Sequence, residues 1–252
     1  MSGETEDQRF ERLSRDRIHR PLPKRFYKSV AVTGQFGIAL DGRNVKTPLK
    51  APLVLPNRTL AEAVAAEWDA QIEVINPHAM PLTKLANTAI DRAVAEKSKI
   101  TAEILEFAGS DMVCYRAESP EGLVLRQTTH WNPIIAWAKS DLNAGFETVS
   151  TITHRRQSAE ALQALEAHIT AFDPFSFVTV HNLTTLTGSA LLAAMIAAGK
   201  ISADAAWLAA NVDEDWQIGT WGEDAEAMAR REGRLSEFLA CAKFLNLVHI
   251  RP

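Results

Sequence analysis

The chain of 252 residues is 46% hydrophobic and 23% charged, which excludes a wholly disordered or fibrous protein and allows a core without disulfides or metals. Its net charge of −4 and its pI near 6.0 argue against nucleic acid or an anionic membrane surface as the partner. The two cysteines, Cys114 and Cys241, lie far apart and form no paired motif, which fits a reducing compartment.

The first segment, residues 1–24, is polar and carries charges of both signs. It lacks the apolar stretch of a secretory signal, and its acidic residues argue against an uncleaved mitochondrial presequence. We therefore interpret residues 1–24 as a mobile charged arm that precedes the folded part of the chain.

Residues 25–57 follow a period of two, which is typical of β-strands. Apolar and polar residues alternate from Phe26 to Val32, and Asp41-Gly42 between two such runs is a strong hairpin signal. Prolines punctuate the next stretch, where Leu53 to Leu55 is expected to form a short edge strand. The sequence therefore predicts a small β-rich N-terminal domain of three or four strands over residues 25–57.

Residues 58–252 are expected to form a larger, all-helical C-terminal domain, which makes the fold class α+β. Thr59 and Glu62 have the spacing of a capping box, and Leu60, Val64, Trp68 and Ile72 share one helical face, which places Trp68 in the core. The longest apolar run, nine residues from 190 to 198, is too short to span a membrane. Six further helices are predicted, at Pro81–Ala108, Arg126–Ala144, Ser158–Phe172, Asn182–Ala198, Ser202–Thr220 and Glu223–Leu247.

Signatures of catalysis are absent from the sequence. None of the seven histidines belongs to HExxH or to a pair four residues apart, so no metal site and no cofactor are expected. One enzymatic alternative remains, a hydrolase in which Ser189 and the nearby His181 form an unmarked site within a polar stretch. Ser189 is not part of a nucleophile elbow, and close helix packing explains the same residues.

Two segments stand out as sequence features. The first runs from Glu67 to Gln71 and continues at Met80 to Asn87. The second runs from residue 212 to 226 and combines six acidic residues with Trp216 and Trp221. Acidic residues near a helix start complement the helix dipole, which is the structural interpretation of the second segment. The functional interpretation is an acidic binding surface, because tryptophan anchors with a polar rim are typical of protein interfaces.

Together, several short strings of this sequence resemble the assembly chaperones that act on the α subunit of F1-ATPase, a family found in mitochondria and α-proteobacteria. The resemblance covers about residues 25–235 and is specific only when its motifs are combined. It implies a β-rich N-terminal domain and a helical C-terminal domain, in agreement with the periodicity. The strings are Arg25-Phe-Tyr27, Leu40-Asp-Gly-Arg43, Thr47-Pro48, Glu67-Trp-Asp-Ala-Gln71, Met80-Pro-Leu-Thr83, Leu85-Ala-Asn87, Asp213-Glu-Asp-Trp-Gln-Ile218 and Trp221-Gly-Glu-Asp224.

The resemblance further implies a function without catalysis, namely binding the free F1 α subunit and preventing its aggregation before it pairs with the β subunit. A generic protein-binding scaffold is the alternative that differs only in partner. The resemblance implies that an acidic residue in the C-terminal region is important for function. Together with the tryptophans of that region, it gives these partner-binding candidates: Glu214, Asp215, Gln217, Trp221, Glu223, Asp224 and Glu226. Structural or motif roles are expected for Trp68, Asp69, Pro81, Leu82 and Asn87.

These expectations also concern the cell compartment and the assembly state. We expect no nucleic acid, no membrane insertion and a monomer when the chain is free of its partner. A bacterial protein of this kind would act in the cytoplasm, and a eukaryotic one in the mitochondrial matrix.

Overall fold

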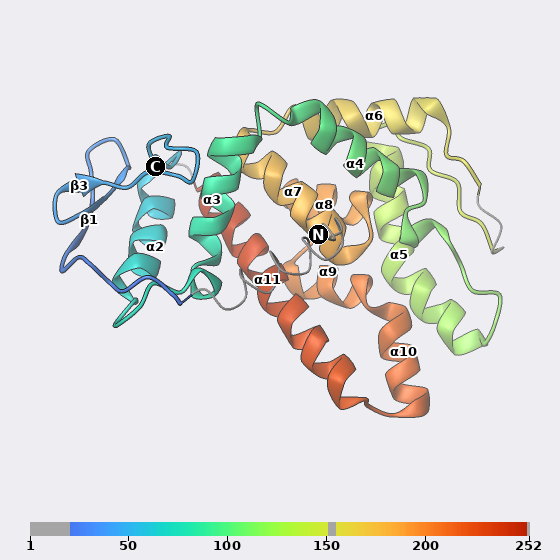
Figure 1. Ribbon diagram of the computed structural model, residues 1–252. Coiled ribbons are helices and arrows are strands. Elements are labelled where there is room, and N and C mark those ends of the chain that lie inside the picture. Colours follow the sequence, from blue (N-terminus) through green and yellow to red (C-terminus); the bar gives the residue numbers. More distant parts are fainter. Residues whose placement is uncertain (1–20, 151–154, 251–252) are drawn as a thin grey trace, which may run out of the picture.

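The computed structural model describes residues 21–150 and 155–250, so most of the predicted charged arm lies outside the described residues. A three-stranded antiparallel sheet comes first, formed by β1 (Val30–Val32), β2 (Ile38–Leu40) and β3 (Arg43–Asn44) in that order. Ten α-helices follow in the described parts of the chain. Figure 1 shows the sheet at one end of the molecule, with the helices forming the rest. The predicted α+β class is therefore confirmed.

The predicted hairpin joins β2 and β3 at Asp41-Gly42. Both turn residues have positive φ, 47° at Asp41 and 79° at Gly42, and Leu40 pairs with Arg43 directly beside them. Two consecutive left-handed residues make a type I′ turn, whose twist matches that of the flanking strands. Glycine is needed at the second position because other residues populate this backbone region poorly.

The predicted strand at Leu53–Leu55 is wrong. The segment joins the sheet only through isolated bridges, which pair Val54 with Gly37 and Pro52 with Lys46. The N–H of Leu55 donates to the carbonyl of Phe36 at 3.1 Å, but a continuous ladder does not form. Prolines on both sides lack the N–H that would extend the pairing, which is the physical reason.

The helices pack around a central helix, α7, whose side chains are buried on nearly every face. Such a helix shows little amphipathic period, because all of its faces meet apolar neighbours. It contacts α3, α4, α6, α8 and α11. The helices are α2 (Arg58–Asp69), α3 (Pro81–Arg92), α4 (Lys97–Gly109), α5 (Glu121–Asp141), α6 (Ala159–Thr170), α7 (Pro174–Thr187), α8 (Ala190–Ala197), α9 (Ala203–Ala210), α10 (Val212–Trp221) and α11 (Ala225–His249), with short 3₁₀ turns η1 (Pro77–Ala79) and η2 (Met112–Cys114).

Three predicted helices are divided in the structure. The segment from Pro81 to Ala108 forms α3 and α4, because the chain leaves the helix after Arg92. The predicted helix at 182–198 begins earlier, at Pro174, and breaks at Gly188, whose φ of 70° ends α7. The predicted helix at 202–220 breaks at Asn211 into α9 and α10. Apolar periodicity continued across each break, so it could not reveal these turns.

The start of α2 also differs from the prediction. The N-cap is Asn57, whose Oδ1 accepts the N–H of Leu60 at 2.8 Å, so the predicted capping box at Thr59 is wrong. The amide of Asn57 donates to the carbonyl of Leu247 at 2.8 Å, at the far end of α11. One side chain thus starts α2 and ties it to the C-terminal helix. The boundary between the two predicted domains, at residue 57, stays a prediction.

A carboxyl group lies at the centre of the helical part. Asp111 is fully buried and accepts backbone N–H groups from Val113 at 3.2 Å and from Leu191 at 3.0 Å. It therefore caps η2 and the first turn of α8 at once. Burial raises the pKa of Asp111 from 3.8 to about 6, although these hydrogen bonds oppose the shift.

This raised pKa predicts a pH-dependent stability. The stabilising contribution of Asp111 is complete below pH 3.8 and is lost as the pH rises through about 6. We expect the unfolding free energy of the wild type, relative to Asp111→Asn, to fall by about 2 kcal/mol between about pH 4.5 and 7.5. Urea unfolding of both proteins at the two pH values measures the difference. An equal difference at both values would contradict the prediction.

The described helices include none that is both long and apolar enough to cross a membrane.

Candidate functional site

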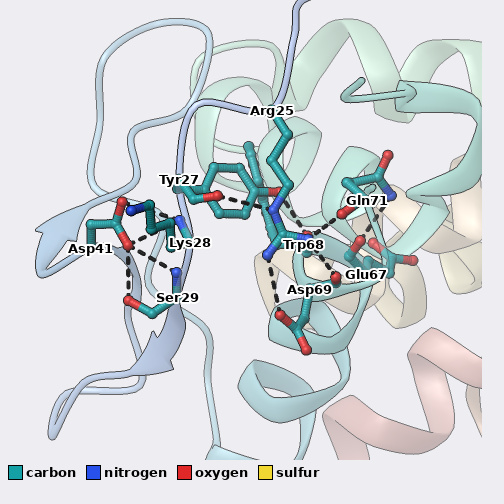
Figure 2. A network of polar contacts seen from close by, with 9 residues as sticks. All are labelled: Arg25, Tyr27, Lys28, Ser29, Asp41, Glu67, Trp68, Asp69 and Gln71. Atoms are coloured by element: carbon teal, nitrogen blue, oxygen red, sulfur yellow. Dashed lines mark hydrogen bonds and ion pairs between the residues drawn. The ribbon is translucent and has the colours of Figure 1, made fainter. Parts of the chain in front are cut away.

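The first candidate region surrounds Arg25, at the junction of the sheet and α2 (Figure 2). Its guanidinium donates to the carbonyls of Tyr27 at 3.0 Å, Asp69 at 2.8 Å and Gln71. It also pairs with the carboxylate of Asp69 at 3.4 Å and lies 4.6 Å from the centre of the Tyr27 ring. One side chain thus joins the N-terminal segment to the end of α2.

Tyr27 and Trp68 form the apolar side of this junction. The Tyr27 hydroxyl donates to the carbonyl of Trp68 at 2.6 Å, and their rings meet edge to face at 5.9 Å. Burial raises the pKa of the Tyr27 hydroxyl. Trp68 is half-buried rather than fully enclosed, and its indole Nε1 has no hydrogen-bond partner among the described residues.

Glu67 connects the two motif segments, Glu67 to Gln71 and Met80 to Asn87, which begin thirteen residues apart in the sequence. Its carboxylate accepts the backbone N–H groups of Leu82 and Thr83, both at 2.8 Å, and the Thr83 hydroxyl at 2.7 Å. The local N-cap of α3, Met80, makes no side-chain capping bond, and Pro81 has no N–H. Glu67 therefore caps α3 from a neighbouring helix. Burial raises its pKa, and the three hydrogen bonds oppose that shift.

The other motif residues have simpler surroundings. Asp69 is exposed apart from its contact with Arg25, whereas Gln71 is buried and bonds the carbonyl of Glu67 at 2.9 Å. Ile72, predicted on the inner face of this helix, lies beyond its end and is 84% exposed. Asn87 lies half-buried on α3, and its Oδ1 has no hydrogen-bond partner in the described chain. The strings that carried the resemblance in this region therefore build one packed junction.

The second candidate region is the tip of the hairpin formed by α10 and α11, which projects at the lower edge of Figure 1. Helix α10 ends at Trp221, and Gly222, with φ of 88°, reverses the chain. Asp224 then starts α11 by accepting the N–H of Ala227 at 2.8 Å. Trp221 is 77% exposed, and Glu223 beside it is exposed as well. A large aromatic side chain thus stands in solvent at a turn held by regular capping.

Two of the predicted acidic residues are paired within the hairpin rather than free at its surface. Glu214 contacts Arg234 at 2.5 Å and Arg231 at 3.7 Å, and Asp215 contacts Arg231 at 2.5 Å. Arg231 is the most buried of this group, with 15% of its side chain exposed. Glu214 and Asp215 therefore join α10 to α11 through these ion pairs. No local sequence pattern marks these arginine partners, because they lie on the next helix.

The remaining acidic candidates divide between local and exposed roles. Glu226 pairs with Arg230 one turn later at 2.5 Å. Asp224 is used as the cap of α11, while Glu223 makes no ion pair with any residue that the structure describes. The negative charge that no described ion pair neutralises at the tip thus lies on Glu223 and Asp224.

A groove runs beside the hairpin tip, with a volume of about 690 Å³. One wall comes from α10, through Trp216, Gln217 and Trp221. The opposite wall comes from the loop after η2 and the start of α5. These wall residues, which the sequence analysis missed, include Tyr115, Arg116, Pro120 and Leu123.

Trp216 fixes one wall of this groove. Its ring lies so close to Gly122 that a Cβ there would meet the indole at 2.8 Å, and Arg126 lies 5.3 Å from the ring centre. A larger residue at position 122 would therefore require the Trp216 ring to move. Trp216 is therefore a packing residue, whereas Trp221, five positions later, is left in solvent.

The enzymatic alternative finds little support in the described residues. Ser189 is fully buried and accepts the N–H of Leu192 at 3.0 Å, so it caps α8. The imidazole of His181 contacts Glu103 at 2.8 Å. A group of three or more potential metal ligands does not occur in residues 21–150 and 155–250.

Comparison with known proteins gives consistent matches. Residues 24–139 match the family described as ATP12 chaperone protein. The mitochondrial protein atp12 of Schizosaccharomyces pombe is 26% identical over 247 residues, which cover 90% of this chain and 84% of that protein. The crystal structure of Atp12 from Paracoccus denitrificans is 36% identical with a TM-score of 0.84, covering 90% of this chain and 99% of that one. The Atu1473 protein from Agrobacterium tumefaciens is 43% identical with a TM-score of 0.83, covering 92% and 89%.

Proposed function

Because this chain belongs to the ATP12 chaperone protein family, we propose that it binds the free α subunit of F1-ATPase and prevents its aggregation until the β subunit pairs with it. The proposed activity is binding alone and requires no catalytic group. It would take place where F1 is assembled, in the bacterial cytoplasm or the mitochondrial matrix.

The observation that carries this proposal is the exposed Trp221 beside its groove. An unassembled subunit exposes apolar surface that its neighbour will later cover, and such surface promotes aggregation. A protein that covers this surface needs an apolar anchor, and a tryptophan at the centre of an interface is among the strongest anchors known. With 77% of its surface in solvent, Trp221 is available for such a contact.

The hairpin geometry supports a preformed binding surface. The ion pairs of Arg231 and Arg234 with Asp215 and Glu214 fasten together the two helices that carry the tip before any partner arrives. Preorganisation lowers the entropy lost on binding, so a small surface gains affinity. Glu223 and Asp224 at the rim would favour a partner with basic groups and contribute to specificity more than to affinity.

A paired substitution tests the role of the tip. We expect Trp221→Ala with Glu223→Lys to weaken binding to the purified α subunit by about tenfold or more, because an interface anchor and a rim charge are both removed. The melting temperature should change by less than about 2 °C, since both side chains are exposed. Isothermal calorimetry and circular dichroism measure the two quantities.

The matched control changes an exposed apolar residue and an exposed acid elsewhere. Val94 is 78% exposed and Glu106 is exposed on α4, so Val94→Ala with Glu106→Lys alters the same kinds of group. The control should bind the α subunit as the wild type does. A large loss of thermal stability in the tip variant would instead assign Trp221 to the fold.

Partner choice distinguishes this chaperone from a generic scaffold. Capture with immobilised chain should retain the purified α subunit of F1-ATPase and leave the β subunit in the flow-through. Addition of the β subunit should then release the α subunit. Equal retention of both subunits, or of neither, would refute the proposed specificity.

A further inference from the structure

The N-terminal sheet has a charge opposite to that of the whole chain. Residues 21–57 contain six basic residues and one acidic residue, a net charge of +5, whereas the complete chain carries −4. A separation of charge on this scale marks a surface for a partner of opposite sign. The basic residues are Lys24, Arg25, Lys28, Arg43, Lys46 and Lys50, and all except Arg25 are exposed.

A hollow of about 580 Å³ lies on this sheet, and we name it the basic hollow. Aromatic rings line it, namely Phe26, Tyr27 and Trp68, and Arg43 and Lys46 stand along the same lining. Phe26 is 74% exposed, although its ring touches Tyr27 edge to face at 5.4 Å. The basic hollow thus joins an accessible apolar surface to two cationic groups.

The cations of the basic hollow are not used inside the described structure. Neither Arg43 nor Lys46 forms an ion pair with another described residue, in contrast to the arginines of α11. Asp41, the one acid in the lining of the hollow, accepts the N–H of Ser29 at 2.8 Å, its hydroxyl at 2.9 Å, and the N–H of Lys28 at 3.1 Å. These hydrogen bonds lower the pKa of Asp41. Asp41 therefore holds the hairpin to the preceding segment, as Figure 2 shows.

Two rings of the basic hollow, those of Tyr27 and Trp68, are held in place by contacts within the fold. Arg25 fixes Tyr27 through the ring contact and the bond to its carbonyl. The hydroxyl of Tyr27 is bound to the backbone at Trp68, on α2. Figure 2 shows both rings between the hairpin side, with Asp41, and the end of α2. The part of the apolar surface that Tyr27 and Trp68 form is therefore in place before a ligand arrives, which favours binding.

We propose that the basic hollow is a second docking site for polypeptide, which takes a segment with one large apolar side chain flanked by acidic side chains. The apolar side chain lies against Phe26 and Trp68, and the acidic groups pair with Arg43 and Lys46. Charge complementarity chooses the segment and speeds its approach, while the apolar contact supplies affinity. The assignment of this segment to the F1 α subunit depends on the function proposed above.

The N-terminal sheet, on which the basic hollow lies, and the tip of the α10–α11 hairpin lie far apart in the molecule (Figure 1). Two sites on one chain hold a partner more tightly than either alone when both can be engaged at once, because the second contact forms at high effective concentration. The two sites also carry opposite charge, so each accepts a different segment. Such a bivalent grip fixes the orientation of the bound subunit.

Charge reversal tests the basic hollow in the full-length chain. We expect Arg43→Glu with Lys46→Glu to weaken binding to the purified α subunit about tenfold at about 50 mM salt, and much less at about 500 mM. The control, Lys139→Glu with Arg156→Glu, makes the same change of charge at two exposed residues of the helical part that form no described ion pair. It should shift the affinity for the α subunit less than about twofold. Equal losses in both double variants would overturn the proposal.

A second readout separates this inference from the proposed function. The probe is a fluorescein-labelled peptide, Glu-Glu-Leu-Phe-Glu-Glu, measured by polarisation with the full-length chain. It should bind the wild type and the Trp221→Ala variant alike, and bind Arg43→Glu/Lys46→Glu about tenfold more weakly. Phe26→Ala should weaken it about fivefold at both salt concentrations, because the lost contact is apolar.

The peptide results decide the occupant of the basic hollow. Peptide binding that survives while the α subunit is not bound would refute the proposed function and leave the docking site standing. Tighter peptide binding after deletion of residues 1–20 would show that this chain's own start occupies the hollow, which overturns the proposal. Stronger binding of a single-stranded oligonucleotide than of the peptide would overturn it as well.

Discussion

Replacement of Glu67 with alanine should lower the free energy of unfolding by about 4 kcal/mol, because three hydrogen-bond donors lose their acceptor in a partly buried site. The donors are the N–H groups of Leu82 and Thr83 and the hydroxyl of Thr83. The local N-cap residue, Met80, makes no side-chain hydrogen bond, so it does not take the place of Glu67 as an acceptor. The first turn of α3 should therefore loosen from α2.

The measurement is urea unfolding followed by circular dichroism, combined with hydrogen exchange at the start of α3. Glu62→Ala on the same helix is the control, because Glu62 is exposed and only pairs with Arg58 one turn earlier. Its expected cost is below about 0.5 kcal/mol. Similar costs for both variants would show that Glu67 does not act as a cap.

Loss of the Arg25 side chain should be nearly as damaging. We expect Arg25→Ala to cost about 3 kcal/mol, because charged donors to three carbonyl groups and the stacking on Tyr27 vanish together. Its guanidinium is largely enclosed, with 17% of the side chain exposed. The damage should be local, with faster hydrogen exchange in the N-terminal segment and at the end of α2.

Lysine at this position distinguishes geometry from charge. Arg25→Lys keeps the charge but cannot donate in the same forked arrangement, so it should recover less than half of the lost stability. Arg58→Ala is the control, since the exposed Arg58 makes a single pair with Glu62 at 3.3 Å. Full rescue by lysine would mean that charge alone matters at the junction.

Arg25 and Glu67 explain why the motif strings occur together. Arg25-Phe-Tyr27, Glu67 to Gln71 and the start of α3 are three strings separated in sequence that meet at one junction. Disruption of Trp68 would act at the same place, since Tyr27 packs against its ring. The strings therefore describe a shared structural unit, and the residues proposed to contact a partner lie beside it and at the distant hairpin tip.

The acidic segment shows the limit of reasoning from composition. Its acids cluster along the sequence, but Glu214 and Asp215 face Arg234 and Arg231 across the hairpin. Composition gives the charge of each residue, but it does not show which oppositely charged residue the fold places beside it. The packing of Trp216 likewise depends on Gly122 of another helix, whereas Trp221 is left exposed.

Local chemistry was sufficient for part of this protein. Asp41-Gly42 determines its hairpin because the turn requires positive φ at two adjacent residues, and no distant contact is needed. The α+β class followed in the same way from the change of period near residue 57. The tertiary structure alone decided the helix breaks, the capping of α3 by Glu67, the pairing of acids on α10 and the basic hollow. Each of these joins groups from separate elements, and sequence patterns carry no record of such long-range contacts.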